Sequence, residues 1–143
     1  MSEVNISQEP GIEVAWVHSE NGPAGSAETF HILESRMPEL RGRRMYGVFF
    51  QNTGDYYCAV RLDDVQTDDM GFEHGTIPGG YYARRKYKDW GPRIGEIATW
   101  FSQLQKECAD SGLTIDDERP SIEFYRSLTE LIIMAPVIEK SKK

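Results

Sequence analysis

With 143 residues and a formal net charge of −7, the chain is long enough to bury the core of one domain. Its acidity argues against nucleic-acid binding, which depends on lysine and arginine, and no apolar run approaches the ~20 residues of a membrane helix. Because residues 1–10 are polar and lack a signal-peptide core, we expect a cytoplasmic protein with no membrane partner and no direct contact with nucleic acid.

Cysteine and histidine usage argues against disulfides and metal sites. Cys58 and Cys108 are the only cysteines, and each lies among apolar neighbours, so we expect both to be reduced and buried. His18, His31 and His74 are scattered, which does not suit a transition-metal site. We therefore expect neither a metal nor a cofactor.

The first half of the domain, about residues 12–62, predicts a strand, a helix and a hairpin. Residues 12–18 read as a strand, and residues 26–37 have apolar side chains at helical spacing. Two strands rich in β-branched and aromatic residues follow, 43–50 and 56–62, with a turn between them.

The second half, about residues 72–138, repeats this order. An extended region over 72–87 is broken by Pro78, Gly79 and Gly80, and the helix that follows runs from Trp90-Gly91-Pro92 to Ser111-Gly112. Strands at 120–126 and 130–137 complete the domain. The sequence thus predicts a single α+β domain over 1–143, built from two pseudo-symmetric β-α-β-β halves. We expect antiparallel sheets with the two main helices on one side and a ligand groove on the other.

The strand at 120–126 carries a carboxylate within an apolar alternation. Because successive strand residues point to opposite faces, Ile122 and Phe124 share one face, while Ser121, Glu123 and Tyr125 share the other. A partly enclosed carboxylate requires a positive group or hydrogen-bond donors, which indicates a receptor for a cation. The alternative is an ordinary solvated glutamate on the wet face of an antiparallel sheet.

Three segments carry a resemblance to a known family. They are Ile77-Pro78-Gly79-Gly80-Tyr81-Tyr82-Ala83, then Trp90-Gly91-Pro92, and last Arg119-Pro120-Ser121-Ile122-Glu123-Phe124-Tyr125 together with Met134-Ala135-Pro136-Val137. In order and spacing they resemble the GyrI-like small-molecule-binding domain, which is also the effector-binding half of some MerR-type and AraC-type transcription regulators. The resemblance spans roughly residues 12 to 138.

The resemblance implies a multidrug-type pocket for lipophilic cations, with the glutamate that matches Glu123 at its base and aromatic side chains around it. Aligning Gly47 with Glu123 by pseudo-symmetry favours Phe49 over its neighbours as a wall residue. The candidate ligand-binding residues are Glu123, Tyr125, Trp90, Phe49, Tyr46 and Tyr82.

Several of these aromatic residues have other interpretations. Tyr125 is equally consistent with capping a strand edge, and Trp90 with a hydrophobic staple against Ile94. Trp100 and Phe101 lie on the long helix and, like Trp16, are expected in the core.

The chain departs from the family in two respects. Arg84, Arg85 and Lys86 stand where relatives carry apolar residues, which indicates an exposed edge strand or a strand whose basic side chains pair with acidic residues elsewhere. A platform for single-stranded nucleic acid is a further alternative. No DNA-reading segment precedes the first expected strand, so we expect a stand-alone copy. Its expected partners are a lipophilic cationic small molecule and either a second copy of the chain or a separate regulator protein.

The leading functional hypothesis is non-catalytic binding or sequestration of cationic small molecules, with no catalytic residue. A hydrolase acting on strained-ring electrophiles is the alternative, in which Glu123 activates water and Tyr125 donates a proton. A gyrase-modulating protein interaction follows only from the family name.

Overall fold

The computed structural model describes residues 4–36, 44–62, 71–127 and 129–138. Its elements, in chain order, are β1 (Asn5–Glu9), β2 (Ile12–Ser19), the 3₁₀ turn η1 (Gly22–Gly25), α1 (Ser26–Ser35), β3 (Met45–Phe50), β4 (Asp55–Arg61), β5 (Glu73–Ile77), β6 (Gly80–Lys88), the 3₁₀ turn η2 (Gly91–Glu96), α2 (Ile97–Asp110), β7 (Thr114–Ile115), β8 (Ser121–Tyr125) and β9 (Glu130–Ile138).

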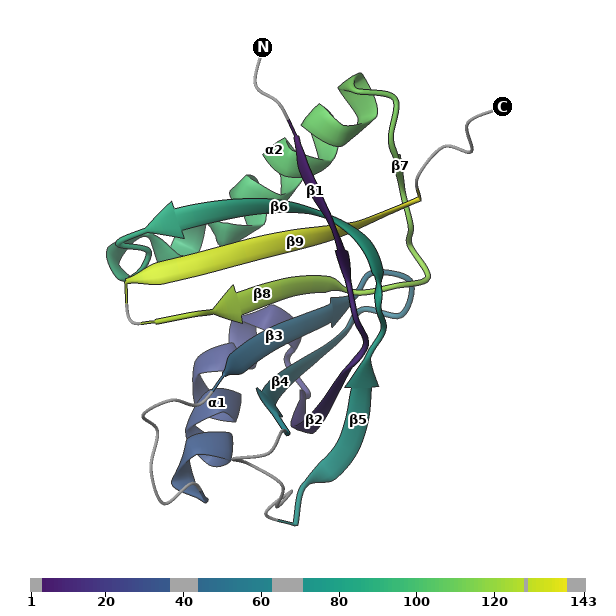
Figure 1. The fold of residues 1–143 in the computed structure, drawn as a ribbon. Helices are drawn as coiled ribbons and strands as arrows, with labels where there is room; N and C mark the ends of the chain where they lie inside the picture. Colours follow the sequence, from purple (N-terminus) through teal and green to yellow (C-terminus); the bar gives the residue numbers. More distant parts are fainter. Residues whose placement is uncertain (1–3, 37–43, 63–70, 128, 139–143) are drawn as a thin grey trace.

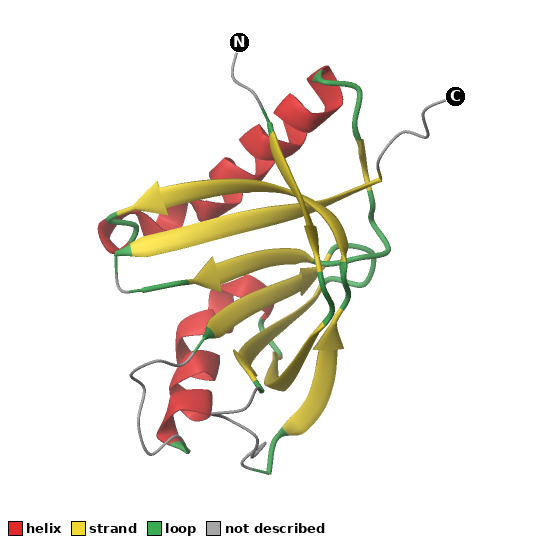
Figure 2. Cartoon of the chain, viewed as in Figure 1, coloured by secondary structure: helices red, strands yellow, loops and turns green. Residues whose placement is uncertain are grey.

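The strands form one curled antiparallel sheet with two helices on one face (Figures 1 and 2). Its order is β1-β6-β9-β8-β3-β4-β2-β5, with β7 paired to β9. This order is symmetric about the central β8–β3 pair. On one side β8 is followed by β9 and β6, and on the other side β3 is followed by β4 and β2. The α+β prediction is confirmed.

The strands that lead into the two halves are exchanged. Strand β1 runs into β2 yet pairs with β6, and β5 runs into β6 yet pairs with β2. The two connecting turns meet closely, because a Cβ added at Gly79 would lie 2.7 Å from both the Glu9 carbonyl oxygen and the Gly11 nitrogen. Each half therefore carries a strand supplied from the start of the other.

This exchange corrects the prediction of a charged edge strand at Arg84. No strand was expected before residue 12, but β1 pairs with the first part of β6, up to the Asn5–Arg84 pair, and β9 pairs with the other side. At Arg85 and Lys86 the expected pairing with acidic residues is observed, because Arg85 forms two hydrogen bonds of 2.7 Å with Glu107 of α2 and Lys86 Nζ lies 3.7 Å from Glu130 Oε2.

The helices cover the same face of the sheet. On α2, Ile97, Trp100, Leu104 and Cys108 follow a helical period and pack against the face that β9 presents. Helix α1 places Leu33 against Cys58 and Val60 of β4, among others. We call this the helix face; it includes Glu123 of β8. Both cysteines are free and buried, as expected.

The opposite face is enclosed by the sheet itself. Three of its apolar side chains, those of Val14 on β2, Val48 on β3 and Tyr82 on β6, are 0% exposed although no described helix covers them. The curl brings the outer strands towards each other around this cluster, and we call it the concave face.

The boundaries differ modestly from the sequence-based expectation. Helix α1 ends at Ser35, β3 begins at Met45, and residues 37 and 43 lie outside the described ranges. The segment expected to open the second helix forms the separate 3₁₀ turn η2, and the predicted stop is observed, with Gly112 at a left-handed φ of 83°. In the described ranges, no helix has the length and apolar character needed to cross a membrane.

Candidate functional site

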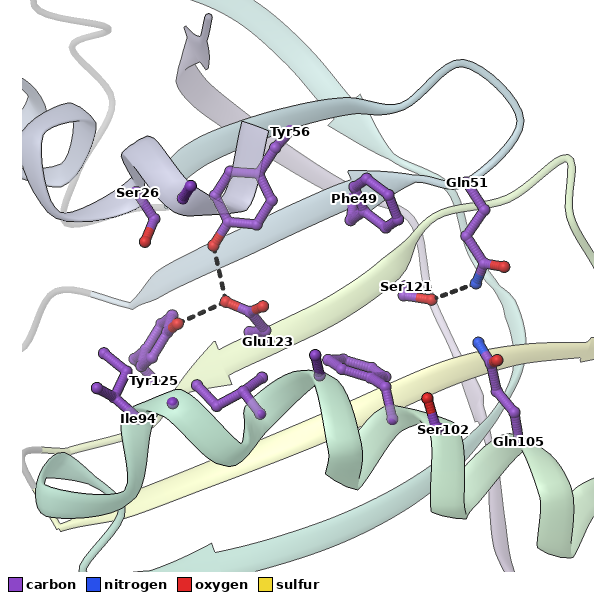
Figure 3. A pocket seen from close by; sticks show the side chains of 15 residues that line it. Ser26, Phe49, Gln51, Tyr56, Ile94, Ser102, Gln105, Ser121, Glu123 and Tyr125 are labelled. Carbon is purple, nitrogen blue, oxygen red and sulfur yellow. Dashed lines mark hydrogen bonds between the residues drawn. The ribbon is translucent and has the colours of Figure 1, made fainter. Parts of the chain in front are cut away.

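A cavity of about 520 Å³ lies on the helix face, where both halves contribute to its wall (Figure 3). Its lining comes from the two 3₁₀ turns, the start of α1, the first three turns of α2 and the middle of the sheet. The lining residues are Ala24, Ser26, Phe49, Gln51, Tyr56, Ile94, Gly95, Ile97, Ala98, Phe101, Ser102, Gln105, Ser121, Glu123 and Tyr125. We expected the groove on the face opposite the helices, and this cavity instead lies between the helices and the sheet. The volume suits a drug-sized molecule.

Glu123 is the single charged side chain among these lining residues. Its Oε1 accepts hydrogen bonds from the Tyr56 hydroxyl at 2.7 Å and the Tyr125 hydroxyl at 2.5 Å. Figure 3 shows the second oxygen directed away from these two rings. No lysine, arginine or histidine lines this part of the described chain, so the carboxylate has no cationic neighbour in the cavity.

Gly47 makes the space for this arrangement. The register pairs Gly47 with Glu123 on one side and with Cys58 on the other, as the expected alignment of Gly47 with Glu123 requires. A Cβ at Gly47 would lie 2.1 Å from the Tyr56 hydroxyl oxygen and 2.5 Å from Glu123 Oε1. Any other residue would therefore push the acid and the phenol apart.

Burial determines the protonation of this cluster. It raises the pKa of the Glu123 carboxyl above its usual range, against the lowering effect of the hydrogen bonds from Tyr125 and Tyr56. Burial, and then the charge of Glu123, raises the pKa of both phenols, so each remains a hydrogen-bond donor at neutral pH. The carboxyl binds its proton more tightly than a solvated glutamate does, because its surroundings supply dipoles but no full positive charge.

Tyr125 is held between two other aromatic rings. Phe30 of α1 meets it edge-on at 5.4 Å between centroids, and Trp90 lies tilted against it at 5.1 Å. The Trp90 indole nitrogen donates to the Ser127 carbonyl oxygen at 3.2 Å. Packing from both halves thus fixes the orientation of the Tyr125 hydroxyl towards Glu123.

The far end of the cavity is polar but uncharged. Gln51 Nε2 donates to Ser121 Oγ at 2.7 Å, and Ser102 and Gln105 of α2 lie across the cavity from this pair (Figure 3). Between the two polar ends the wall is apolar and aromatic, formed by side chains that include Phe49 and Phe101. The cavity therefore combines apolar walls with one acidic end.

The structure brings together three of the six residues proposed from the sequence. Glu123, Tyr125 and Phe49 line the cavity, and Trp90 contacts Tyr125 without lining it. Tyr46 lies on the concave face, where strand alternation directs it away from Glu123.

Tyr82 also lies on the concave face, fully buried, with its hydroxyl donating to the Pro78 carbonyl oxygen at 2.6 Å. Neither Tyr46 nor Tyr82 reaches the cavity of Glu123, because both side chains point to the opposite face of the sheet.

Sequence reasoning missed Tyr56, which donates directly to the acid, and placed Phe101 in the core. Trp100 is buried as expected, but Phe101 is half-buried and lines the cavity. A signal for Tyr56 did exist, because Gly47 interrupts a strand of bulky residues, and such a glycine marks the close approach of another group. The part of the chain that the structure describes holds no group of three potential metal ligands.

Comparison with known proteins gives a fold likeness and no family assignment. No protein-family model matches the sequence, and no curated protein matches it. Among solved structures, the integron cassette protein VCH_CASS2 from the mobile metagenome of Vibrio cholerae is 14% identical, with a TM-score of 0.63 over 94% of this chain and 95% of that one.

Two further structures share the fold. SAV2435, solved bound to tetraphenylphosphonium, is 11% identical with a TM-score of 0.61, over 96% of this chain and 94% of its own. A hydrolase from Listeria innocua is 13% identical with a TM-score of 0.57, over 94% of this chain and 90% of its own. Identities this low establish a common architecture and leave function to be argued from the site.

Proposed function

We propose that this protein binds lipophilic cationic small molecules without chemical conversion, as a member of the GyrI-like group of effector-binding domains. The observation that carries the proposal is Glu123, a half-buried carboxylate that is the single charged group in a cavity lined otherwise by apolar, aromatic and uncharged polar side chains. Such a carboxylate favours a cation that brings its own apolar surface, since that ligand supplies the missing charge and fills the walls.

Two hydrogen bonds stabilise the carboxylate of Glu123 without a cationic partner. Two phenol donors share Oε1, which lowers the cost of burying the ionised form without supplying a competing positive charge. A ligand cation meets a preorganised acceptor and displaces no internal ion pair. The aromatic rings of Tyr125 and Phe49 add cation–π and apolar contact.

The fold likeness to SAV2435, solved with tetraphenylphosphonium, suggests the first ligand to test. Isothermal titration with tetraphenylphosphonium, read in parallel by tryptophan fluorescence, should give saturable 1:1 binding. Glu123→Gln should weaken it about tenfold or more, the loss expected for a charge pair at roughly 5 Å in a partly screened site. Glu20→Gln removes the same charge from an exposed position and should leave the affinity unchanged.

Tetraphenylborate provides the matched ligand control, because it has the same shape and the opposite charge. We expect it not to compete with tetraphenylphosphonium for this cavity. An affinity for the phosphonium that is unchanged in Glu123→Gln would remove the acid from the proposal, and an absence of saturable binding would remove the proposal itself.

Hydrolysis of a strained-ring electrophile is the second candidate, since an acid with a raised pKa is suited to general acid–base chemistry. The geometry favours binding over hydrolysis, because both phenol protons are directed to Glu123 Oε1 and neither is directed into the cavity. Turnover of an epoxide substrate by the wild-type protein, lost in Glu123→Gln, would reverse this preference.

A further inference from the structure

A second cavity, of about 530 Å³, lies on the concave face and has the opposite electrostatic character. Four arginines line it, Arg44, Arg61, Arg84 and Arg126, against one carboxylate, that of Glu9. This concentration of positive charge is unexpected in a chain whose formal net charge is −7.

Strand alternation places the arginines together. Arg44, Arg61 and Arg126 each stand two residues from a concave-face side chain on β3, β4 or β8. The β3–β4 register, continued by one residue, sets Arg44 opposite Arg61. The backbone N–H of Arg61 donates to the backbone carbonyl oxygen of Arg44 at 2.9 Å. The β3–β8 register, continued in the same way, sets Arg126 opposite Arg44 on its other side.

Three like charges thus stand side by side across neighbouring strands, an arrangement that weakens a sheet. Arg84 reaches the same cavity from β6 because the sheet curls. Its Nε is buried and has no hydrogen-bond partner among the described residues.

Little in the described chain neutralises this group. One guanidinium nitrogen of Arg126 lies 3.7 Å from Glu130 Oε2, at the outer limit of an ion pair. No described carboxylate lies within 4.0 Å of the guanidinium nitrogens of Arg44, Arg61 or Arg84. The Glu9 carboxylate instead accepts a 2.5 Å hydrogen bond from Ser7. The Arg61 guanidinium interacts with the Tyr46 hydroxyl, and its other donors, with those of Arg44 and Arg84, remain available to an external acceptor.

The floor of the cavity is aromatic. The rings of Tyr46 and Phe124 stack at 4.9 Å between centroids with an interplanar angle of 17°, and both line the cavity. Arginine binds carboxylate and phosphate groups through two parallel N–H donors, so several arginines above an aromatic floor suit a flat molecule with more than one negative charge.

We propose that the concave-face cavity binds a small organic polyanion, with carboxylate or phosphate groups on the arginine row and an apolar or aromatic body on the Tyr46–Phe124 stack. A small molecule is favoured over a nucleic acid, because these four arginines line a single cavity and a chain of net charge −7 would repel an extended polyanion.

The test uses benzene-1,3,5-tricarboxylate, which has a flat aromatic body, and pyrophosphate, which has none. At about 0.15 M salt, where weak surface attraction is screened, calorimetry should show saturable binding of at least one of them. Tighter binding of the tricarboxylate supports an anion whose aromatic body lies on the Tyr46–Phe124 stack, and tighter binding of pyrophosphate would remove that stack from the proposal.

Arg44→Gln and Arg84→Gln should each weaken the tighter probe roughly tenfold, the usual loss of a hydrogen bond to a charged group. Lys106→Gln removes a positive charge from the exposed surface of α2 and should have no effect. Glu123→Gln should also have no effect, which separates this cavity from the proposed cation site.

The proposal is overturned if neither probe saturates, or if the arginine variants bind as tightly as the wild-type protein. It is also overturned if Lys106→Gln causes an equal loss, because the attraction would then belong to the whole surface. Circular dichroism and unfolding midpoints of each variant establish that a loss of binding is not a loss of fold.

Discussion

The two cavities lie on opposite faces of the same strands, and the charged side chains that line them are opposite in sign. On β8 and the residue after it, Glu123 and Tyr125 face the helix side, while Phe124 and Arg126 face the concave side. The volumes are similar, about 520 and 530 Å³, so size does not distinguish them. A period of two residues is enough to give one thin sheet an acidic site and a basic one, and the net charge of a chain is a poor guide to either.

The largest expected effect is on the helix-face cavity alone. Gly47→Val would place carbon atoms where the Tyr56 hydroxyl and Glu123 Oε1 now lie. We expect a loss of about 1–3 kcal/mol in the free energy of unfolding, measured with urea, and a loss of most tetraphenylphosphonium binding. Gly91→Ala is the stability control, because an added methyl group there meets no atom within 4 Å and Gly91 does not line the cavity. Tricarboxylate binding that fell equally with phosphonium binding in Gly47→Val would mean that the two cavities are not independent.

The second effect is a dependence of cation binding on pH. Since the pKa of Glu123 is raised in the free protein and a bound cation favours the ionised form, the association constant of tetraphenylphosphonium should increase with pH. The slope should reach at most about tenfold per pH unit and vanish above the raised pKa of Glu123. Calorimetry across the pH range checks this, and Glu123→Gln should give a flat profile.

The same shift has a consequence for the ligand-free fold. The folded state holds the Glu123 proton more tightly than the unfolded chain does, so its contribution to stability is greatest below the ordinary glutamate pKa and is lost as pH rises through the raised value. The difference in unfolding free energy between the wild-type protein and Glu123→Gln should therefore change across that window. A difference that stays constant with pH would contradict the raised pKa.

A smaller effect is expected from the tyrosines. Tyr125→Phe keeps the ring between Phe30 and Trp90 but removes a donor to Glu123, so the pKa of the acid should rise further. Phosphonium affinity at neutral pH should fall several-fold, and the pH profile should move to higher pH. Tyr57→Phe, a change on the concave face, is the matched control and should leave the profile in place. A profile that also stays in place for Tyr125→Phe would contradict a lowering role for this hydroxyl.

The smallest effect concerns the arginine row. Arg44→Gln relieves repulsion from Arg61 and Arg126 and should raise the unfolding free energy by a few tenths of a kcal/mol at low salt, with no gain at high salt. A saturating polyanion should cancel the gain, because it binds the wild-type protein more tightly and stabilises it more than the variant. Thermal unfolding at two salt concentrations checks this, and destabilisation at low salt would contradict the account of the row.

Much of the fold follows from local periodicity. Two helices and most strands were predicted within a few residues, because their apolar positions repeat at helical or strand spacing in the residues themselves. Strand β1 was not predicted, since Asn5–Glu9 is mostly polar and its pairing partner lies more than 70 residues away on β6. Without β1, strand β6 was expected to be an edge strand, although β1 covers part of it.

The candidate site was likewise predicted where it depends on local alternation and mispredicted where it depends on the whole sheet. The alternation that puts Ser121, Glu123 and Tyr125 on one face is visible in the sequence, and all three line the cavity. Which face carries the helices depends on the handedness and curl of the whole sheet, so the groove was expected on the wrong side. Tyr46 was retained as a candidate for the same reason, because nothing local distinguishes it from Phe49 until the register with β8 is known.

The exchanged strands β1 and β5 bear on how a ligand enters. Because each half holds a strand of the other, and the turns at Gly11 and Gly79 are in contact, the halves cannot swing apart like the jaws of a hinge. The aperture of the cavity at Glu123 is then set by side chains at its mouth, such as the exposed Ile94, and not by domain motion. Under the proposed function, a rigid backbone frame with movable side chains at the cavity mouth would admit cations of varied shape and favour their fast exchange.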